Sequence, residues 1–334
     1  MQVIGDIADK TKVIVNFTNV AGTNVGGFAA FHGGMIGMVD GMTLNGVGAI
    51  VGSTLTNMTG SETATTTSWV KDSYAAGIGA SGAGSLILLG AHLSINHFYY
   101  SVAADENAQV SAFGGGVTGT DAGDVNFLAR HGAMIHCTPC TGNRAVDTTP
   151  AQLSSGGLLG CNFTAEDGGR LEISGSSGSN SAIGAVCGIS NGSAWGHNFI
   201  ASGGLGGLSA TNSFGIWAVE GAYLEMTGAR VSRYNVGVYA SGGAGIALGG
   251  GLVTANRSDG MQADGGHIET GGTPVTNNRG YGFHALHQGK IQCFSASPAS
   301  CTGSATGNLS GIASVEAAGT LNGFPYSAST FLSN

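Results

Sequence analysis

Acidic and basic side chains recur in short polar turns of this sequence, most of them beside glycine. A pair of carboxylic acids can cut a glycosidic bond, one acting as the acid and the other as base or nucleophile. A base beside a neutralising cation can instead abstract a proton. The side chains available for such roles are Asp105 and Glu106, Arg130 and His131, Glu166 and Asp167, Glu220, Asp264 and His287.

Glu220 and Asp264 are the catalytic candidates of this set. The repeat described below places them two coils apart, which corresponds to about 10 Å. That separation is near the upper limit for an inverting pair of carboxylic acids. Polar residues are also common in turns for conformational reasons alone, and the chain has no nucleophile-elbow or HExxH motif. The sequence therefore leaves open whether the chain is an enzyme.

A second set of side chains is expected on the outer face of strands, because successive side chains of a strand point to opposite faces. Aromatic rings, amides and imidazoles suit a sugar, since they offer an apolar face and hydrogen bonds at its edge. Exposed Tyr and Trp suit an interface between subunits equally well. Glycan binding or a subunit interface is therefore predicted for Trp217, Tyr239, Gln262 and His284, for Tyr223 and His267 with Lys290 on the next strand, and for Arg257 and Arg279.

The elements that position these side chains belong to a repeat. Each repeat reads glycine, an apolar residue, any residue, alanine, a short polar turn and then a second apolar residue. Four copies begin 22, 23 and 22 residues apart, upstream segments from Val70, Val102, Phe127 and Phe163 fit the same template, and weaker copies occur near Ile189 and Ile312. The four copies are "GIWAVEGAYLEM" from Gly215, "GVYASGGAGIAL" from Gly237, "GMQADGGHIET" from Gly260 and "GFHALHQGKIQC" from Gly282.

Short apolar alternations between glycine and asparagine turns indicate strands, and a period of twenty-odd residues is typical of a parallel β-solenoid. The sequence predicts an all-β parallel β-helix of about ten coils of 22–27 residues, with insertions. Glycine supplies the left-handed corners and the close approach of successive coils. One corner is predicted to stack asparagines along the rod: Asn212, Asn235, Asn256 and Asn278.

Composition excludes several classes of protein. Glycine accounts for 62 of 334 residues, but it does not recur at every third position, so the chain is not a collagen. The hydrophobic content of 42% and the 5 prolines argue against a disordered linker. The net charge of −8, without a basic stripe, argues against nucleic acid as a partner. The longest apolar run, Leu86 to Gly90, is too short to cross a bilayer. The N-terminus does not read as a secretory signal. No cofactor is expected.

The six cysteines leave their oxidation state open. The motif "HCTPC" resembles half of a zinc site, but no second motif follows, so no metal is predicted. Cys293 and Cys301 bracket an insertion that a disulfide could close, whereas buried free thiols are at least as compatible with assembly in a reducing cytoplasm.

The repeat resembles the right-handed parallel β-helix of bacteriophage tail fibres and tailspikes, and more distantly that of pectate-lyase-like proteins. The likeness covers about residues 70 to 334 and includes the ending "GFPYSASTFLSN". It implies a right-handed coil and a homotrimer that stands on the virion tail, contacts other tail proteins and binds a host-surface glycan. A polysaccharide lyase or hydrolase on the same rod is the alternative, and a purely structural solenoid is a third reading.

The resemblance also suggests an organisation of the chain. Residues 70–323 are predicted to form the parallel β-helix and residues 324–334 a C-terminal tail. Residues 1–69 fit the repeat poorly and are read as an N-terminal cap or virion-attachment segment, or as more irregular coils. A cap at each end of a solenoid hides its apolar cross-section. A phage protein would also explain the lack of a signal sequence, since phage particles leave the host by lysis.

Overall fold

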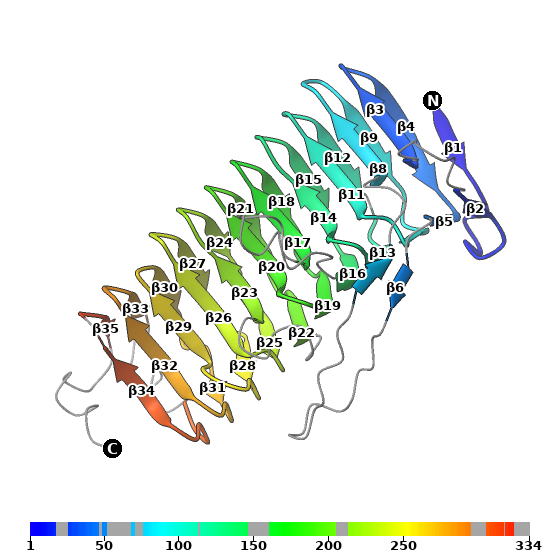
Figure 1. Cartoon of the computed structure of the whole chain (residues 1–334). Helices are drawn as coiled ribbons and strands as arrows, with labels where there is room; N and C mark the ends of the chain where they lie inside the picture. Colours follow the sequence, from blue (N-terminus) through cyan, green and yellow to red (C-terminus); the bar gives the residue numbers. More distant parts are fainter. Residues whose placement is uncertain are drawn as a thin grey trace.

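The computed structural model describes residues 1–17, 26–46, 49–51, 68–70, 76–112, 114–145, 160–204, 213–294, 305–316 and 318–323. These residues form a right-handed parallel β-helix, as the sequence predicts. Three all-parallel sheets of 12, 10 and 11 strands run along the rod, and we call them sheets A, B and C. The strands follow one another in sequence order from one end of the rod to the other (Figure 1).

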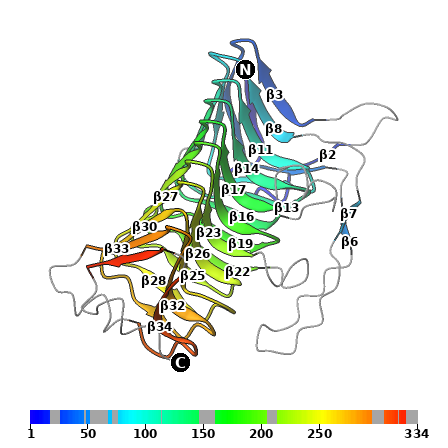
Figure 2. The ribbon, with the colours of Figure 1, turned by 60° about the vertical axis from the view of Figure 1, so that its left-hand side comes forward.

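Each complete coil runs from a strand of sheet C to one of sheet A and then to one of sheet B. Within the described residues nine coils carry a strand in all three sheets, and partial coils flank them. Figure 2 brings the side-by-side strands of sheet B into view. Sheet A comprises β1 (Gln2–Ile4), β4 (Met35–Asp40), β9 (Leu86–Leu89), β12 (Gln109–Ala112), β15 (Met134–Cys137), β18 (Arg170–Glu172), β21 (Ser193–Trp195), β24 (Tyr223–Glu225), β27 (Gly245–Leu248), β30 (His267–Thr270), β33 (Lys290–Cys293) and β35 (Thr320–Asn322).

Sheets B and C complete the coils, and a short antiparallel pair, β6 (Ala49–Val51) and β7 (Ser68–Val70), stands apart from them. Sheet B comprises β2 (Ile14–Asn16), β5 (Met42–Asn45), β10 (Leu93–Asn96), β13 (Val117–Ala122), β16 (Cys140–Ala145), β19 (Ser177–Ser181), β22 (Ile200–Gly204), β25 (Arg230–Ser232), β28 (Leu252–Thr254) and β31 (Val275–Thr276). Sheet C comprises β3 (Phe28–Phe31), β8 (Ala76–Ser81), β11 (Tyr100–Asp105), β14 (Val125–Ala129), β17 (Cys161–Glu166), β20 (Gly184–Ile189), β23 (Phe214–Ala218), β26 (Val236–Ser241), β29 (Met261–Asp264), β32 (Tyr281–Leu286) and β34 (Gly311–Val315).

The sequence predicts a separate N-terminal segment, residues 1–69, and a C-terminal tail, residues 324–334. The described strands up to residue 46, β1 to β5, pair into the same three sheets as the later coils. The predicted tail, residues 324–334, lies outside the described residues. No helix that could cross a lipid bilayer occurs in the described ranges.

The core of the rod is a set of stacked apolar columns, one for each inward position of the repeat. The alanine of the repeat forms one such column in sheet C, and the larger side chains two residues before it form another. Phe127 and Phe163 stack face to face, with centroids 4.7 Å apart, and Phe199 meets Phe163 edge-on. The alanine column contains Ala80, Ala104, Ala129, Ala165, Ala218, Ala240, Ala263 and Ala285, all buried.

The turn that joins sheet C to sheet A explains two features of the repeat. Two successive residues there adopt a left-handed backbone, as at His131 and Gly132 or Glu220 and Gly221. The glycine just before the sheet A strand permits close contact with the previous coil: a Cβ on Gly169 would lie 2.1 Å from the carbonyl oxygen of Ala129. Both requirements favour glycine because it lacks a Cβ.

The predicted asparagine ladder exists between sheets B and C, with one correction. Buried Asn256 donates from Nδ2 to Oδ1 of Asn278 at 2.8 Å, and Asn278 donates in the same way to Asn308 at 2.8 Å. Asn235 is not part of this ladder, because the buried residue in register with Asn256 is Tyr234, whose backbone N–H donates to Asn256 Oδ1. Asn212 lies outside the described residues.

The described cysteines are oxidised, so for them the disulfide-bonded alternative holds and the free-thiol alternative does not. Cys137 pairs with Cys140 inside the motif that resembles a zinc half-site, and Cys161 pairs with Cys187 on the neighbouring coil. Cys293 is also disulfide-bonded. The predicted partner of Cys293, Cys301, lies outside the described residues.

Candidate functional site

The outer face of sheet C carries side chains that could bind a ligand or take part in catalysis. In the strands from β3 to β32 the two residues that flank the buried alanine, or Gly188 in β20, stack in register into two columns on the outer side of the sheet, and Leu128, Thr164 and Cys187 of the middle part of the rod are buried there. We call the residue before the alanine the middle column and the residue after it the rim column. The middle column changes in size along the rod, from small residues near the N-terminal end to aromatic and polar ones near the other.

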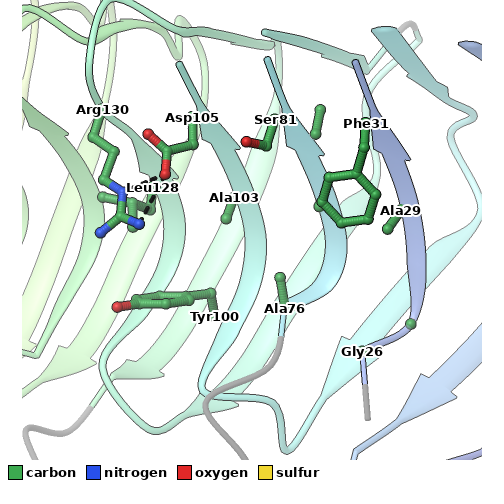
Figure 3. Close-up of a pocket in the computed structure, with 13 residues that line it drawn as sticks. Gly26, Ala29, Phe31, Ala76, Ser81, Tyr100, Ala103, Asp105, Leu128 and Arg130 are labelled. Atoms are coloured by element: carbon green, nitrogen blue, oxygen red, sulfur yellow. Dashed lines mark hydrogen bonds and ion pairs between the residues drawn. The ribbon is translucent and has the colours of Figure 1, made fainter. Parts of the chain in front are cut away.

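A basin with a volume of about 460 Å³ lies where the middle column is small. Ala29, Gly79 and Ala103 are in register on β3, β8 and β11 and form its floor. Figure 3 shows Ala103 near the centre, with Tyr100 on one side and the paired Asp105 and Arg130 on the opposite side. The remaining lining residues are Gly26, Gly27, Phe31, Ala76, Ala80, Ser81 and Leu128.

The charged side of the basin is a rigid, hydrogen-bonded cluster. The Arg130 guanidinium donates from Nε and Nη2 to Oδ2 of Asp105, at 2.9 and 2.8 Å. His131 Nδ1 lies 2.7 Å from Oδ1 of Asp105, and its Nε2 lies 3.4 Å from Oδ2 of Asp167. Burial opposes the charge of Asp105, but the hydrogen bonds and charges of Arg130 and His131 outweigh it and lower its pKa. The pair is therefore ionised over the physiological range.

Glu166 stands beside this cluster in the rim column, next to Arg130 on the following coil. Burial raises its pKa to about 7, because Arg130 and His131 only partly offset the loss of water around the carboxyl group. Tyr100 is also half-buried, and burial together with the charge of Asp124 raises its pKa above the ordinary value. The Tyr100 hydroxyl is therefore neutral and available for hydrogen bonding.

The two catalytic candidates chosen from the sequence, Glu220 and Asp264, are held by different partners. Glu220 is an exposed turn residue that accepts a hydrogen bond from Ser190 Oγ at 2.6 Å, on the coil before it. Asp264 ends β29, where its Oδ1 lies 2.7 Å from Nδ1 of His287 on the coil after it. Asp264 Oδ2 also accepts a hydrogen bond from the Tyr239 hydroxyl at 3.4 Å, so Asp264 is held by both neighbouring coils.

The predicted outward column is present in the middle column of sheet C. Trp217, Tyr239, Gln262 and His284 are in register on successive strands, and all four are partly exposed. Phe214, which the sequence analysis did not select, stacks on both Trp217 and Tyr239 with centroids 5.7 and 4.8 Å away. The aromatic rings therefore form one continuous, half-buried platform.

His284 anchors the end of this column. Its Nδ1 lies 2.7 Å from Asp259 Oδ2, and its Nε2 lies 3.3 Å from Glu316 Oε1. Burial disfavours the imidazolium, but the hydrogen bonds and charges of the two carboxylates outweigh it and raise the pKa of His284. This histidine links three neighbouring coils.

The other predicted residues lie on other faces. Tyr223, His267 and Lys290 share a column of sheet A, separated from sheet C by the left-handed turn. Arg257 and Arg279 follow the asparagine ladder on successive coils, where burial and the charge of Arg279 lower the pKa of Arg257. The sequence-predicted residues therefore do not form a single site.

The basin residues Tyr100 and Arg130 were not selected as binding residues from the sequence. A signal for Tyr100 does exist: it precedes the first core residue of its strand, Val102, by two positions, as Phe214 precedes Ile216. The same offset would have identified both aromatic residues. Within the part of the chain that the structure describes, no three His, Cys, Asp or Glu side chains gather in a way that could hold a metal ion.

Comparison of the chain with models of known protein families, with curated proteins and with solved structures found no match.

Proposed function

We propose that this chain is a glycan-binding rod of the tail-fibre and tailspike type, and that the basin on sheet C is its binding site. The observation that supports this proposal is an aromatic ring, Tyr100, facing a fixed donor–acceptor pair, Arg130 and Asp105, across a floor of small residues. A pyranose ring offers the matching surfaces: an apolar face for Tyr100 and hydroxyl groups for the charged pair. The volume of about 460 Å³ lies within the usual range for small-ligand sites.

The test is binding of the purified protein to an array of bacterial-surface and plant polysaccharide fragments, followed by titration calorimetry of the fragments that bind. Tyr100→Ala removes the platform and should weaken binding about fivefold or more, since an aromatic contact of this size contributes about 1 to 3 kcal/mol. Phe294→Ala, which truncates an exposed aromatic residue near the other end of the rod, is the matched control and should bind normally. Binding that survives in Tyr100→Ala would place the site elsewhere. No binding by the wild type would favour a purely structural rod.

A polysaccharide-cleaving enzyme is the second candidate, and Glu166 is the observation that favours it. A carboxyl group with a pKa of about 7 can hold a proton for a leaving group near neutral pH. Asp105 is a poor base for the same reaction, because Arg130 and His131 already occupy its two oxygens. Release of new reducing ends by the wild type but not by Glu166→Gln would establish this activity.

The homotrimer, the contacts with other tail proteins and the location in the virion tail complete the proposal. The repeat and the right-handed parallel β-helix support it, because rods of this kind stand on phage particles as trimers. Light scattering on the native protein should give three times the 33.0 kDa of one chain. A monomer would contradict the trimer and would favour a free-standing enzyme.

A further inference from the structure

Carboxylates gather at the charged side of the basin. The two charged residues that line it, Asp105 and Arg130, cancel each other. Beside them stand Glu106, which is exposed, and Asp167, whose side chain is half exposed. Glu166 adds further negative charge as it ionises near neutral pH. A ligand that enters the basin therefore meets more carboxylates than cations.

Arg130 does not change this balance. Two of its guanidinium nitrogens are committed to one oxygen of Asp105, and the other oxygen of Asp105 takes His131 Nδ1 and the backbone N–H of Glu106. A ligand carboxylate that approached Arg130 would also approach Asp105. If the ligand displaced Asp105 from Arg130, the half-buried Asp105 carboxylate would lose its Arg130 partner, which is unfavourable.

We infer that the basin selects uncharged pyranose residues and discriminates against uronic acids and other sugars that carry a carboxylate. This inference rests on the proposed function of the same site and names its ligand class. Hydroxyl groups can accept from the outward-facing N–H groups of Arg130 and donate to carboxylate oxygens, whereas a ligand carboxylate can only accept. The carboxylates at the site repel a ligand carboxylate, and repulsion of the unwanted ligand is a common source of specificity.

The experiment uses the full chain and a matched pair of ligands. Acidic oligosaccharides, such as tetragalacturonate, are presented as the free acid and as the methyl ester, alongside neutral oligosaccharides, at pH 8 and low salt. Esterification removes the charge and leaves the sugar unchanged. We expect neutral fragments and esters to bind, and their binding to depend on Tyr100. The affinity for the free acid should be about fivefold or more lower than the affinity for its ester.

Two variants test the origin of the discrimination. Asp105→Asn removes the central charge and frees Arg130, so the preference for the ester should vanish or reverse. Glu106→Gln removes an exposed charge without affecting the Arg130 contacts, and should reduce the preference about twofold. Glu225→Gln, which removes a histidine-paired carboxylate from sheet A, is the control and should leave the preference unchanged.

The outcomes separate this inference from the proposed function. If no fragment binds the wild type, the proposed function fails and the ligand class fails with it. If fragments bind through Tyr100 but the free acid binds as tightly as the ester, the site stands and the inference is wrong. If Glu106→Gln and folded Asp105→Asn both keep the full preference, the carboxylates of the basin are not its cause, and the inference is again wrong.

Discussion

Glu166→Gln is the substitution whose effect on stability follows most directly from the structure. In the folded chain burial raises the pKa of Glu166 to about 7, against its ordinary 4.5. The folded state therefore holds this proton between pH 4.5 and 7, where the unfolded chain has released it. The contribution of Glu166 to the free energy of unfolding is highest below pH 4.5, falls as the pH rises, and levels off above pH 7.

The size of this effect follows from the two pKa values. Each tenfold change in an ionisation constant corresponds to about 1.4 kcal/mol, so the interval from 4.5 to about 7 corresponds to at most about 3.5 kcal/mol. Partial exposure of the side chain reduces it, and we expect 1 to 3 kcal/mol, roughly. Glutamine is neutral at every pH, so Glu166→Gln should match the wild type near pH 4.5 and be more stable by that amount at pH 8.

The assay is urea unfolding followed by circular dichroism at pH 4.5, 6, 7 and 8. The matched control is Glu220→Gln, because Glu220 is exposed in the turn of a later coil and accepts one hydrogen bond that glutamine can also accept. Its free energy of unfolding should follow that of the wild type within about 0.5 kcal/mol. A Glu166→Gln variant whose difference from the wild type is the same at pH 4.5 and pH 8 would refute the reasoning.

Two further predictions concern the links between coils. Asn278→Ala removes the middle of the asparagine ladder and leaves buried donors of Asn256 without their acceptor. It should lower the free energy of unfolding by about 2 to 4 kcal/mol. A loss below about 0.5 kcal/mol in urea unfolding would contradict a stabilising ladder. Cys161→Ala/Cys187→Ala removes a disulfide that closes a loop of 26 residues, so it should cost about 3.5 kcal/mol. The wild type treated with reductant should lose at least as much, because reduction also opens the Cys137–Cys140 disulfide. Equal melting temperatures with and without reductant would argue against that contribution.

Much of the fold could be predicted from the repeat. The glycine, apolar and alanine positions set which side chains point inward, and their period places them one above another on successive coils. For this reason the register of Trp217, Tyr239, Gln262 and His284 was correct. The error at Asn235 has an equally local cause: "VSRYN" has one residue more between its valine and its asparagine than "VTAN", so Tyr234 enters the buried position instead.

The candidate site was harder to predict because it depends on insertions of unequal length. Asp105 and Arg130 are 25 residues apart, whereas Arg130 and Glu166 are 36 residues apart, yet all three occupy the same column. Their positions in the sequence mark them as turn residues, but the pairing of Asp105 with Arg130 arises only across coils. The basin has no sequence signal either, because its floor consists of side chains that are small or absent, as at Gly79.

The sequence by itself therefore determined the parallel β-helix, because inward and outward positions recur with a short and regular period. It also determined part of the asparagine ladder, since Asn256 and Asn278 keep the same distance from the preceding valine. Only the tertiary structure decided which charged groups meet and where the surface is hollow. Those properties arise between coils, from residues that are distant in the chain and adjacent only once each coil has packed on the one before it.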